Sequence, residues 1–231
     1  KSKTGWYNIY EQLVEKNNIP FYPRGFPWSK RKYLIKSKNT KVYRKRKKIV
    51  LINGLVLEDP DIDAISRLFW PIRVIGSKNN ITSNFGLYPG TWSSFNNQNT
   101  STSRELTSVF FTPVAAGRNS DIWTSYIICK LVETSKDVVA FGAPYVKQFR
   151  NPHNLWTDLK DELPNNILTD YFVNLLSSIN LKKSSYLNML ISLIEKSLNK
   201  IRKDKKLNKI EKRILSSYFK EYKIWAVSIS N

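Results

Sequence analysis

The 231-residue chain has few cysteines, few histidines and no long apolar run, and these shortages exclude several classes of protein. Cys129 is the only cysteine, which excludes an intramolecular disulfide and a zinc site built from several thiolates. It lies in the apolar run 126–129, so we interpret it as a small buried hydrophobic residue. No segment approaches the roughly 20 consecutive apolar residues that span a bilayer.

Acidic residues are also scarce, because 18 Asp and Glu stand against 38 Lys and Arg, for a net charge of +20. A field of that sign attracts polyanions such as nucleic acid, an anionic membrane or the phosphates of sugar nucleotides. The basic run 30–48 carries eleven Lys or Arg among its nineteen residues and no acidic residue. A role with a polyanion and a merely solvated basic surface both remain open.

Apolar and aromatic residues are plentiful, at 41% and 13% of the chain. A hydrophobic core can therefore form, and global disorder is excluded. The seven Trp, twelve Tyr and eleven Phe exceed what packing alone usually requires. Proteins that bind sugars and proteins that bind nucleic acids both use such rings, so the rings narrow the function without deciding it.

The first part of the chain alternates between strand and helix patterns. Residues 1–28 are expected to form a short amphipathic helix and then a loop punctuated by prolines. Segment 49–52 reads as a buried strand that ends at Asn53-Gly54, and segment 138–141 as a second strand. Between them, the turn 59–63 is expected to open a short helix.

Further helices are predicted from apolar spacing. Residues 104–111 could form a helix or a strand, and a longer helix is expected after the segment 117–121. The composition changes at Pro164, after which helical patterns cover about residues 167–179, 185–203 and 207–222. The last two are rich in lysine.

The alternation predicts an α/β domain over residues 1–163, followed by a basic α-helical extension over 164–231. The first part has too few strands for a complete doubly wound domain. We therefore expect about half of a Rossmann-like sheet.

Three short segments carry side chains that could take part in binding or catalysis as well as in packing. Arg24 precedes a glycine on the proline-stiffened loop 22–29, where it could present a bidentate donor to phosphate. Asp61 and Asp63 follow the strand at 49–52 and could hold a hard cation at the end of a sheet. Asp121 heads a predicted helix and could act as a general base. Each segment also has a purely structural interpretation, as a rigid turn for the first and as helix caps for the other two.

The ordered series of motifs resembles the C-terminal part of the reversibly glycosylated polypeptides (plant arabinopyranose mutases) and the related STELLO-like proteins, over about residues 5–162. The segment 24–29 is similar to an Arg-Gly-Tyr-Pro-Phe-Ser motif, and 60–64 to a Pro-Asp-x-Asp-Ala turn. The segment 117–123 is similar to Gly-Arg-Tyr-Asp-Asp-Met-Trp. The series is completed by Asn99 with Arg104-Glu105-Leu106, by Pro144-Tyr145 and by Asn151-Pro152.

The resemblance implies a GT-A-like glycosyltransferase fold, present here as its acceptor-side half, that acts on a nucleotide sugar. Arg24 is then the counterpart of the arginine that is reversibly glycosylated in the mutases, and Asp121 is the candidate catalytic base. The substrate-binding residues expected on this basis are Arg24, Asp61, Asp63, Asn99, Arg118 and Trp123. Arg24 and Arg118 would neutralise the diphosphate, and rings such as Trp92 and Trp123 would stack on sugar faces.

The chain departs from the family pattern at two positions of its site. The first aspartate of the family's acidic pair is Ser120 here, and the family histidine after Pro-Tyr is Gln148. The sole histidine, His153, is the candidate metal ligand in its place, for a divalent cation such as manganese or magnesium. The family's nucleotide-binding strands and Asp-x-Asp motif precede the region where this chain begins, so they are expected either upstream or to have been lost.

The expected partners are a nucleotide-sugar donor and a glycan or protein acceptor, in a protein that is cytoplasmic or Golgi-associated by resemblance. The basic segments could contact a polyanion or a membrane surface, and the protein could form a homo- or hetero-oligomer. The alternative is a basic nucleic-acid-binding or scaffold protein with a degenerate glycosyltransferase domain. A third interpretation is a catalytically inactive glycosyltransferase domain that serves in assembly.

Overall fold

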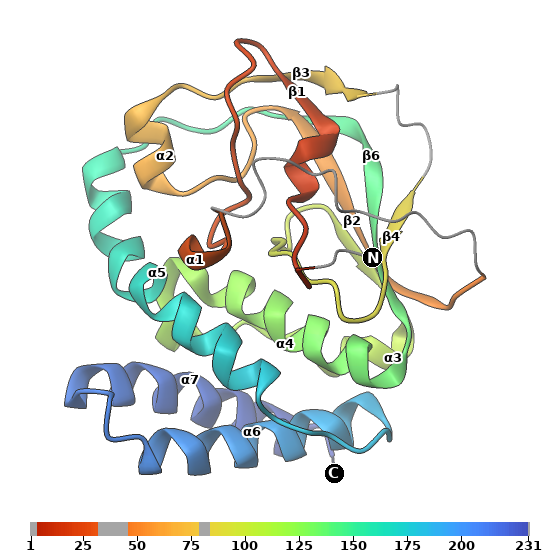
Figure 1. Ribbon diagram of the computed structural model, residues 1–231, viewed down its shortest axis with the longest axis vertical. Coiled ribbons are helices and arrows are strands. Elements are labelled where there is room, and N and C mark those ends of the chain that lie inside the picture. Colours follow the sequence, from red (N-terminus) through yellow and green to blue (C-terminus); the bar gives the residue numbers. More distant parts are fainter. Residues whose placement is uncertain (1–3, 32–45, 79–83, 231) are drawn as a thin grey trace.

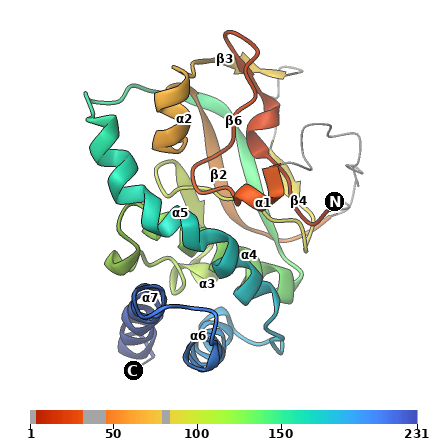
Figure 2. The ribbon, with the colours of Figure 1, turned by 60° about the vertical axis from the view of Figure 1, so that its left-hand side comes forward.

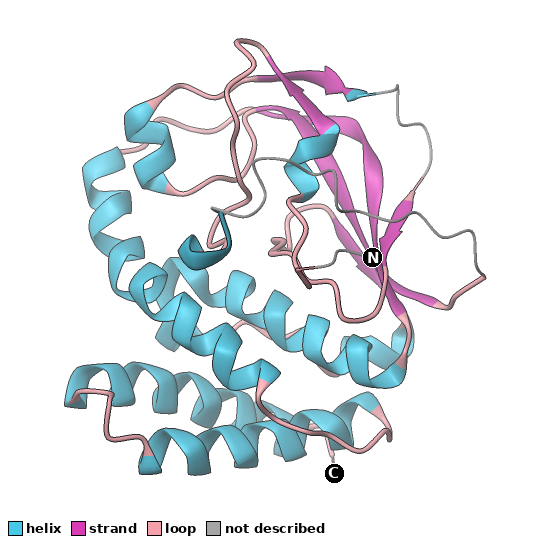
Figure 3. Cartoon of the chain, in the orientation of Figure 1, coloured by secondary structure: helices cyan, strands magenta, loops and turns pink. Residues whose placement is uncertain are grey.

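The computed structural model describes residues 4–31, 46–78 and 84–230, and these form a mixed α/β fold around a six-stranded sheet. Helices lie against one side of the sheet, and the last two form a hairpin at the edge of the molecule farthest from it (Figures 1 and 3). The predicted α/β class is therefore confirmed. The predicted basic run 30–48 lies mostly outside the described residues.

Strands and helices alternate in the first part of the chain, and the second part contains the helices α5 to α7. The strands are β1 (Leu13–Glu15), β2 (Ile49–Glu58), β3 (Val74–Ser77), β4 (Phe85–Leu87), β5 (Thr100–Thr102) and β6 (Val138–Gln148). The helices are α1 (Trp28–Arg31), α2 (Ala64–Phe69), α3 (Arg104–Thr107), α4 (Ser120–Ser135), α5 (Leu155–Ser177), α6 (Tyr186–Lys203) and α7 (Lys209–Ser228). The 3₁₀ helices η1 (Ile9–Gln12) and η3 (Val114–Asn119) lie among them.

The centre of the sheet is the parallel pair β2 and β6, within the strand order β1-β3-β2-β6-β4, and β5 pairs with β2. The other strand pairs are antiparallel. A parallel pair needs a long crossover connection, and α4 supplies its last helix directly before β6. Both central strands were predicted, but they are longer than the apolar runs that predicted them. β2 continues past Asn53-Gly54 to Glu58 because β6 pairs with it on both sides of an irregularity between Gly54 and Val56.

Helix α4 confirms the helix predicted after residue 121. Its apolar side chains are buried on nearly every side, because it lies between the sheet and the C-terminal helices. It ends at Lys136, whose left-handed backbone (φ 69°) turns the chain into β6. This position fixes the N-terminus of α4, and with it Asp121, near the ends of the neighbouring loops.

The amphipathic helix predicted near the N-terminus is wrong for most of its length. Between residues 4 and 15, which the structure describes, only Ile9–Gln12 is helical, as a single 3₁₀ turn, and Leu13–Glu15 forms the edge strand β1. β1 pairs with β3, where Leu13 faces Ser77. Hydrogen bonds to a strand about 60 residues away therefore override the local apolar spacing.

The predicted boundary at residues 163 and 164 falls inside one continuous helix, because α5 runs through Pro164. One hydrophobic cluster includes residues of the sheet, of α4 and of all three C-terminal helices. Trp123 of α4 stacks on Phe172 of α5 at 4.4 Å between ring centroids, and Tyr218 of α7 meets both rings edge-on. The helices after Pro164 are therefore part of the core rather than an appended domain (Figure 2).

None of the helices among the described residues is both long enough and apolar enough to cross a bilayer.

Candidate functional site

The candidate site is centred on Arg24, a buried arginine on the loop between β1 and α1. Its Nε–H donates to both carboxylate oxygens of Asp61 at 3.0 Å, and its Nη2 donates to both oxygens of Asp121 at 3.1 Å. Its Nη1 donates to the backbone carbonyl of Arg118. Three segments that lie far apart in sequence therefore meet at one guanidinium group.

Asp61 is the most heavily bonded carboxylate of this cluster and is 2% exposed. Besides Arg24, it accepts hydrogen bonds from Nη2 of Arg150 at 2.7 Å and from Nδ2 of Asn96 at 3.1 Å. Burial alone would raise the pKa of Asp61, but the charges of Arg24 and Arg150 and the hydrogen bonds from Arg24 and Asn96 lower it to about 2. Asp61 is thus a fixed negative charge at any pH near neutral.

Asp121 differs from Asp61 in its environment. It lies in the first turn of α4, keeps 14% of its side-chain surface exposed, and borders a cavity of about 10 Å³, which is the space of about one water molecule. Burial raises the pKa of Asp121, and the nearby Arg24 lowers it less than burial raises it. Two aspartates on one arginine therefore have pKa values shifted in opposite directions, which is a pattern typical of acid–base sites.

Asp63 belongs to a second ion pair beside the first. It is fully buried, pairs with Arg31 and accepts a hydrogen bond of 2.7 Å from the backbone N–H of Gly25. The guanidinium of Arg31 lies 4.0 Å from the ring centroid of Trp28. Asp63 therefore fixes the backbone next to Arg24 and has no exposed surface for a ligand.

A third group of charges extends the cluster toward α5. Arg118 pairs with Glu162 at 3.2 Å and with Asp158 at 3.1 Å, and His153 places Nδ1 3.3 Å from Asp158. Glu162 also accepts a hydrogen bond from the backbone N–H of Ala64 at the start of α2. Arg118 is thus joined to Arg24 by the hydrogen bond at its backbone carbonyl, and His153 is joined to Arg118 only through the charge contacts of Asp158.

Three residues predicted to bind the substrate serve the core or the sheet instead. Trp123 is fully buried, with its ring on Phe172 and its Nε1–H donating to Thr169, so it cannot stack on a sugar in this structure. Trp92 is also buried and donates to Glu133. Asn99 accepts a hydrogen bond at its carbonyl from the N–H of Gly54, and its side chain fills the space above that glycine.

Several residues that complete the cluster were not predicted from the sequence. Asn96, Arg150, Asp158 and Glu162 each contact one of the predicted residues directly. Arg150 lies two positions after Gln148, which ends β6 and is the counterpart of the family histidine. This position in the motif series could have identified Arg150 as a site residue. Asn96 stands in a polar stretch without any motif, and nothing in the sequence distinguishes it.

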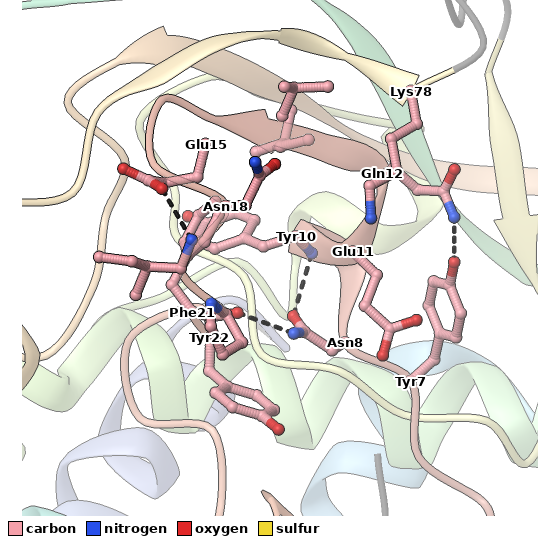
Figure 4. A pocket seen from close by; sticks show the side chains of 14 residues that line it. Tyr7, Asn8, Tyr10, Glu11, Gln12, Glu15, Asn18, Phe21, Tyr22 and Lys78 are labelled. Carbon is pink, nitrogen blue, oxygen red and sulfur yellow. Dashed lines mark hydrogen bonds between the residues drawn. The ribbon is translucent and has the colours of Figure 1, made fainter. Parts of the chain in front are cut away.

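A cavity of about 490 Å³ lies beside the cluster, between η1, β1 and the loop that leads to Arg24 (Figure 4). Polar and aromatic side chains share its lining, among them Tyr7, Glu11, Gln12 and Tyr22. Tyr10 connects the cavity to the cluster, because it lines the cavity and its hydroxyl donates to the carbonyl of Asp61 at 3.1 Å.

Among the described residues, no three His, Cys, Asp or Glu side chains come together in a group that could hold a metal ion. The carboxylates of Asp61 and Asp121 are engaged by guanidinium groups, and His153 is engaged by Asp158. We therefore assign no metal ligand in this arrangement.

Comparison of the chain with protein-family models and with curated protein sequences gave no match.

Proposed function

We propose that this chain carries the acceptor side of a GT-A-like glycosyltransferase that transfers or rearranges a glycosyl group from a nucleotide sugar. The observation that supports the proposal is the meeting of Arg24, Asp61 and Asp121 at one place, each contributed by a different motif of the resembling series.

In the proposed reaction, Asp121 is the general base. A hydroxyl oxygen of the acceptor attacks the anomeric carbon of the donor sugar and passes its proton to Asp121. The bond from that carbon to the nucleoside diphosphate breaks, and the diphosphate leaves with the electron pair. Because burial raises the pKa of Asp121, the carboxylate is a stronger base than an exposed aspartate.

Arg24 and Asp61 position the base rather than react. Asp61 stays ionised and holds the guanidinium of Arg24, which in turn holds Asp121 by two hydrogen bonds of 3.1 Å. Loss of either residue would leave Asp121 without its orientation. In this structure both Arg24 and Arg118 are paired with carboxylates, so we assign to them no contact with the donor diphosphate.

The cavity of about 490 Å³ is the place where we expect part of the acceptor glycan to bind beside the site. Its tyrosine rings and its amide and carboxylate side chains are the groups that bind the faces and the hydroxyls of sugars. Asp121 does not line this cavity, so the reacting hydroxyl would have to enter the smaller cavity that Asp121 borders. The resemblance implies a divalent cation on the donor diphosphate, and we assign no ligand for it among the described residues.

Binding and turnover of nucleotide sugars test the proposal. UDP- and GDP-sugars are titrated by calorimetry with and without manganese, and hydrolysis or transfer is followed by release of the nucleoside diphosphate. Binding of at least one sugar nucleotide, with turnover lost in Asp121→Asn, supports a transferase. No heat and no turnover with any of them would overturn it.

One observation favours an alternative, an inactive domain of this fold that serves in assembly. Every carboxylate of the Arg24 cluster is already engaged by a guanidinium group, which leaves a closed network suited to stability. A folded protein that binds neither sugar nucleotides nor glycans would support this alternative.

A further inference from the structure

The solvent face of α7 has an unusual composition for an exposed helix. Its exposed residues are basic or aliphatic apart from Ser228, and between Lys209 and Ser228 no acidic side chain is exposed. The two glutamates of α7 make hydrogen bonds within the fold. Glu211 closes the capping box with Asn208, and Glu221 accepts a hydrogen bond from the N–H of Ala115.

Four basic residues of α7 are exposed: Lys209, Arg213, Lys220 and Lys223. Four more lie just before α7: Arg202 and Lys203 in the last turn of α6, and Lys205 and Lys206 in the turn that connects the two helices. Asp204, within that turn, is engaged by the hydroxyl of Tyr171 and by the N–H of Lys206. Lys223 meets Glu195 of α6 at 3.7 Å across the exposed surface. Glu195 offsets part of the charge of Lys223, but the other seven basic residues leave the face strongly electropositive.

Three aliphatic side chains stand among these charges. Ile210, Ile224 and Val227 are 62%, 71% and 47% exposed. At about 100° per residue, they share an arc of about 140° with the four basic residues of α7, and they extend along roughly 25 Å of the helix. Exposed aliphatic groups set among basic side chains match the surface of an anionic bilayer, which presents an apolar layer beneath charged headgroups.

We propose that the exposed face of α7, with the turn before it, binds the surface of an anionic lipid bilayer. Basic side chains would lie at the headgroups, where each contributes a factor of about five in affinity, and the three aliphatic side chains would enter the boundary with the acyl chains. The helix is placed for this contact, because α6 and α7 form the edge of the molecule opposite the sheet (Figure 2).

Nucleic acid is the competing polyanion, and the structure favours it less. Proteins that bind single strands stack bases on exposed rings. The aromatic side chains of α6 and α7 are instead turned inward: Tyr186, Tyr218, Phe219 and Tyr222 are buried, and Trp225 stacks on Phe111. Aliphatic side chains offer no such stacking surface.

Vesicle co-sedimentation tests the proposal, which does not depend on the transferase assignment. The protein should bind phosphatidylcholine vesicles that contain about 30% phosphatidylserine, and should not bind phosphatidylcholine alone. Replacing Lys209, Arg213 and Lys220 by Gln should weaken binding about 100-fold. Replacing Ile210, Ile224 and Val227 by Ser should weaken it about tenfold. Circular dichroism should show both variants folded, because every changed side chain is exposed.

A matched control replaces three exposed lysines away from the α6–α7 hairpin, Lys16, Lys147 and Lys160, by Gln. This control should change vesicle binding less than about threefold, since charges beyond a Debye length are screened. Equal loss in the control, or no loss in the serine variant, would overturn the proposal. Salt-sensitive binding to an RNA oligonucleotide that outcompetes the vesicles would overturn it in favour of nucleic acid.

Discussion

The Nε–H of Arg24 donates to both carboxylate oxygens of Asp61 at 3.0 Å, and this pair is 8% and 2% exposed. Arg24 and Asp61 were both predicted to bind the substrate, Arg24 through the diphosphate. In the structure the two residues contact each other, and the remaining donors of the guanidinium reach Asp121 and the carbonyl of Arg118. Arg24 is thus the residue that joins three separate loops, which makes its removal the first test of the site.

Arg24→Ala should lower the free energy of unfolding by about 3–5 kcal/mol, because it leaves buried carboxylates without their partner. Arg24→Lys should recover only part of this loss, since one ammonium cannot bridge two carboxylates as a planar guanidinium does. Urea denaturation measures both. The control Arg73→Ala removes an exposed pair with Glu58 and should leave the midpoint unchanged. A similar midpoint for Arg24→Ala and Arg73→Ala would contradict the structural role of Arg24.

Asp121→Asn should reduce glycosyl transfer about 10²- to 10⁴-fold while the binding of a nucleotide sugar changes little. The amide keeps the size of the side chain but cannot take up the proton. Steady-state rates and calorimetric titration measure the two effects. The matched control Asp161→Asn changes an exposed aspartate of α5 and should leave both unchanged.

The same role of Asp121 sets the pH dependence of the wild-type rate. The rate should rise with pH through a pKa higher than that of an exposed aspartate, because burial raises the pKa of Asp121. The pH dependence of kcat/KM measures it in the free enzyme. An ascending limb centred at the ordinary aspartate pKa would count against Asp121 as the base.

Acid should destabilise the protein through Asp61. Its pKa in the folded protein is about 2, below its value in the unfolded chain, so its contribution to stability is complete above about pH 4 and is lost as the pH falls toward 2. The loss amounts to about 2 kcal/mol. Urea midpoints between pH 2 and pH 6 measure it, and Asp61→Asn should lack this component while starting from a lower stability.

Asp121 contributes to the same acid titration with the opposite sign. Its folded pKa is raised, so the folded state binds its proton more tightly than the unfolded state, and protonation of Asp121 stabilises the fold as the pH falls. Asp121→Asn removes this compensation. Its stability should therefore fall more steeply with acid than that of the wild type, and a shallower fall would contradict the assignment of the two pKa directions.

The α/β class and most helices could be predicted because their signals are local. The apolar spacing of α4 and the buried runs of β2 and β6 lie within single elements, and the structure contains all three. The short strand β1 and the full length of β2 could not be predicted, because partner strands distant in sequence decide them. Arg24, Asp61 and Asp121 were assigned to one site from the motif series and do meet in the structure, whereas Asn96 carries no motif.

The place of the last helices was predicted incorrectly for a related reason. Pro164 and the rise in lysine content suggested a boundary, but a surface rich in lysine does not reveal what the opposite face of a helix contacts. Phe172 and Phe219 stack on each other beneath Trp123, within the same core as α4. Charge patterns describe the exposed face, and only packing shows the buried one.

Phe219→Ala should therefore destabilise the whole protein by about 3–5 kcal/mol and not the C-terminal helices alone. Far-ultraviolet circular dichroism and tryptophan fluorescence should report one coincident transition in urea, because the core is shared. Phe69→Ala, at a residue that is 83% exposed, is the matched control and should change the midpoint little. Two separate transitions would instead support the prediction from the sequence that the C-terminal helices form a separate extension.

Gly25→Ala tests how closely the Arg24 loop must approach α4. Gly25 has a φ of 63°, a conformation that costs an alanine about 1 kcal/mol, and a Cβ there would lie 2.6 Å from Cγ2 of Ile122, the neighbour of Asp121. The variant should lose stability in urea, and transfer activity should fall with it because the loop moves away from the base. Gly76→Ala is the control, since a Cβ at that residue would have no neighbouring atom within 4 Å and its φ is not positive. Retained activity in a folded Gly25→Ala protein would mean that the loop can shift without disturbing Asp121, and Arg24 would then not be the residue that orients it.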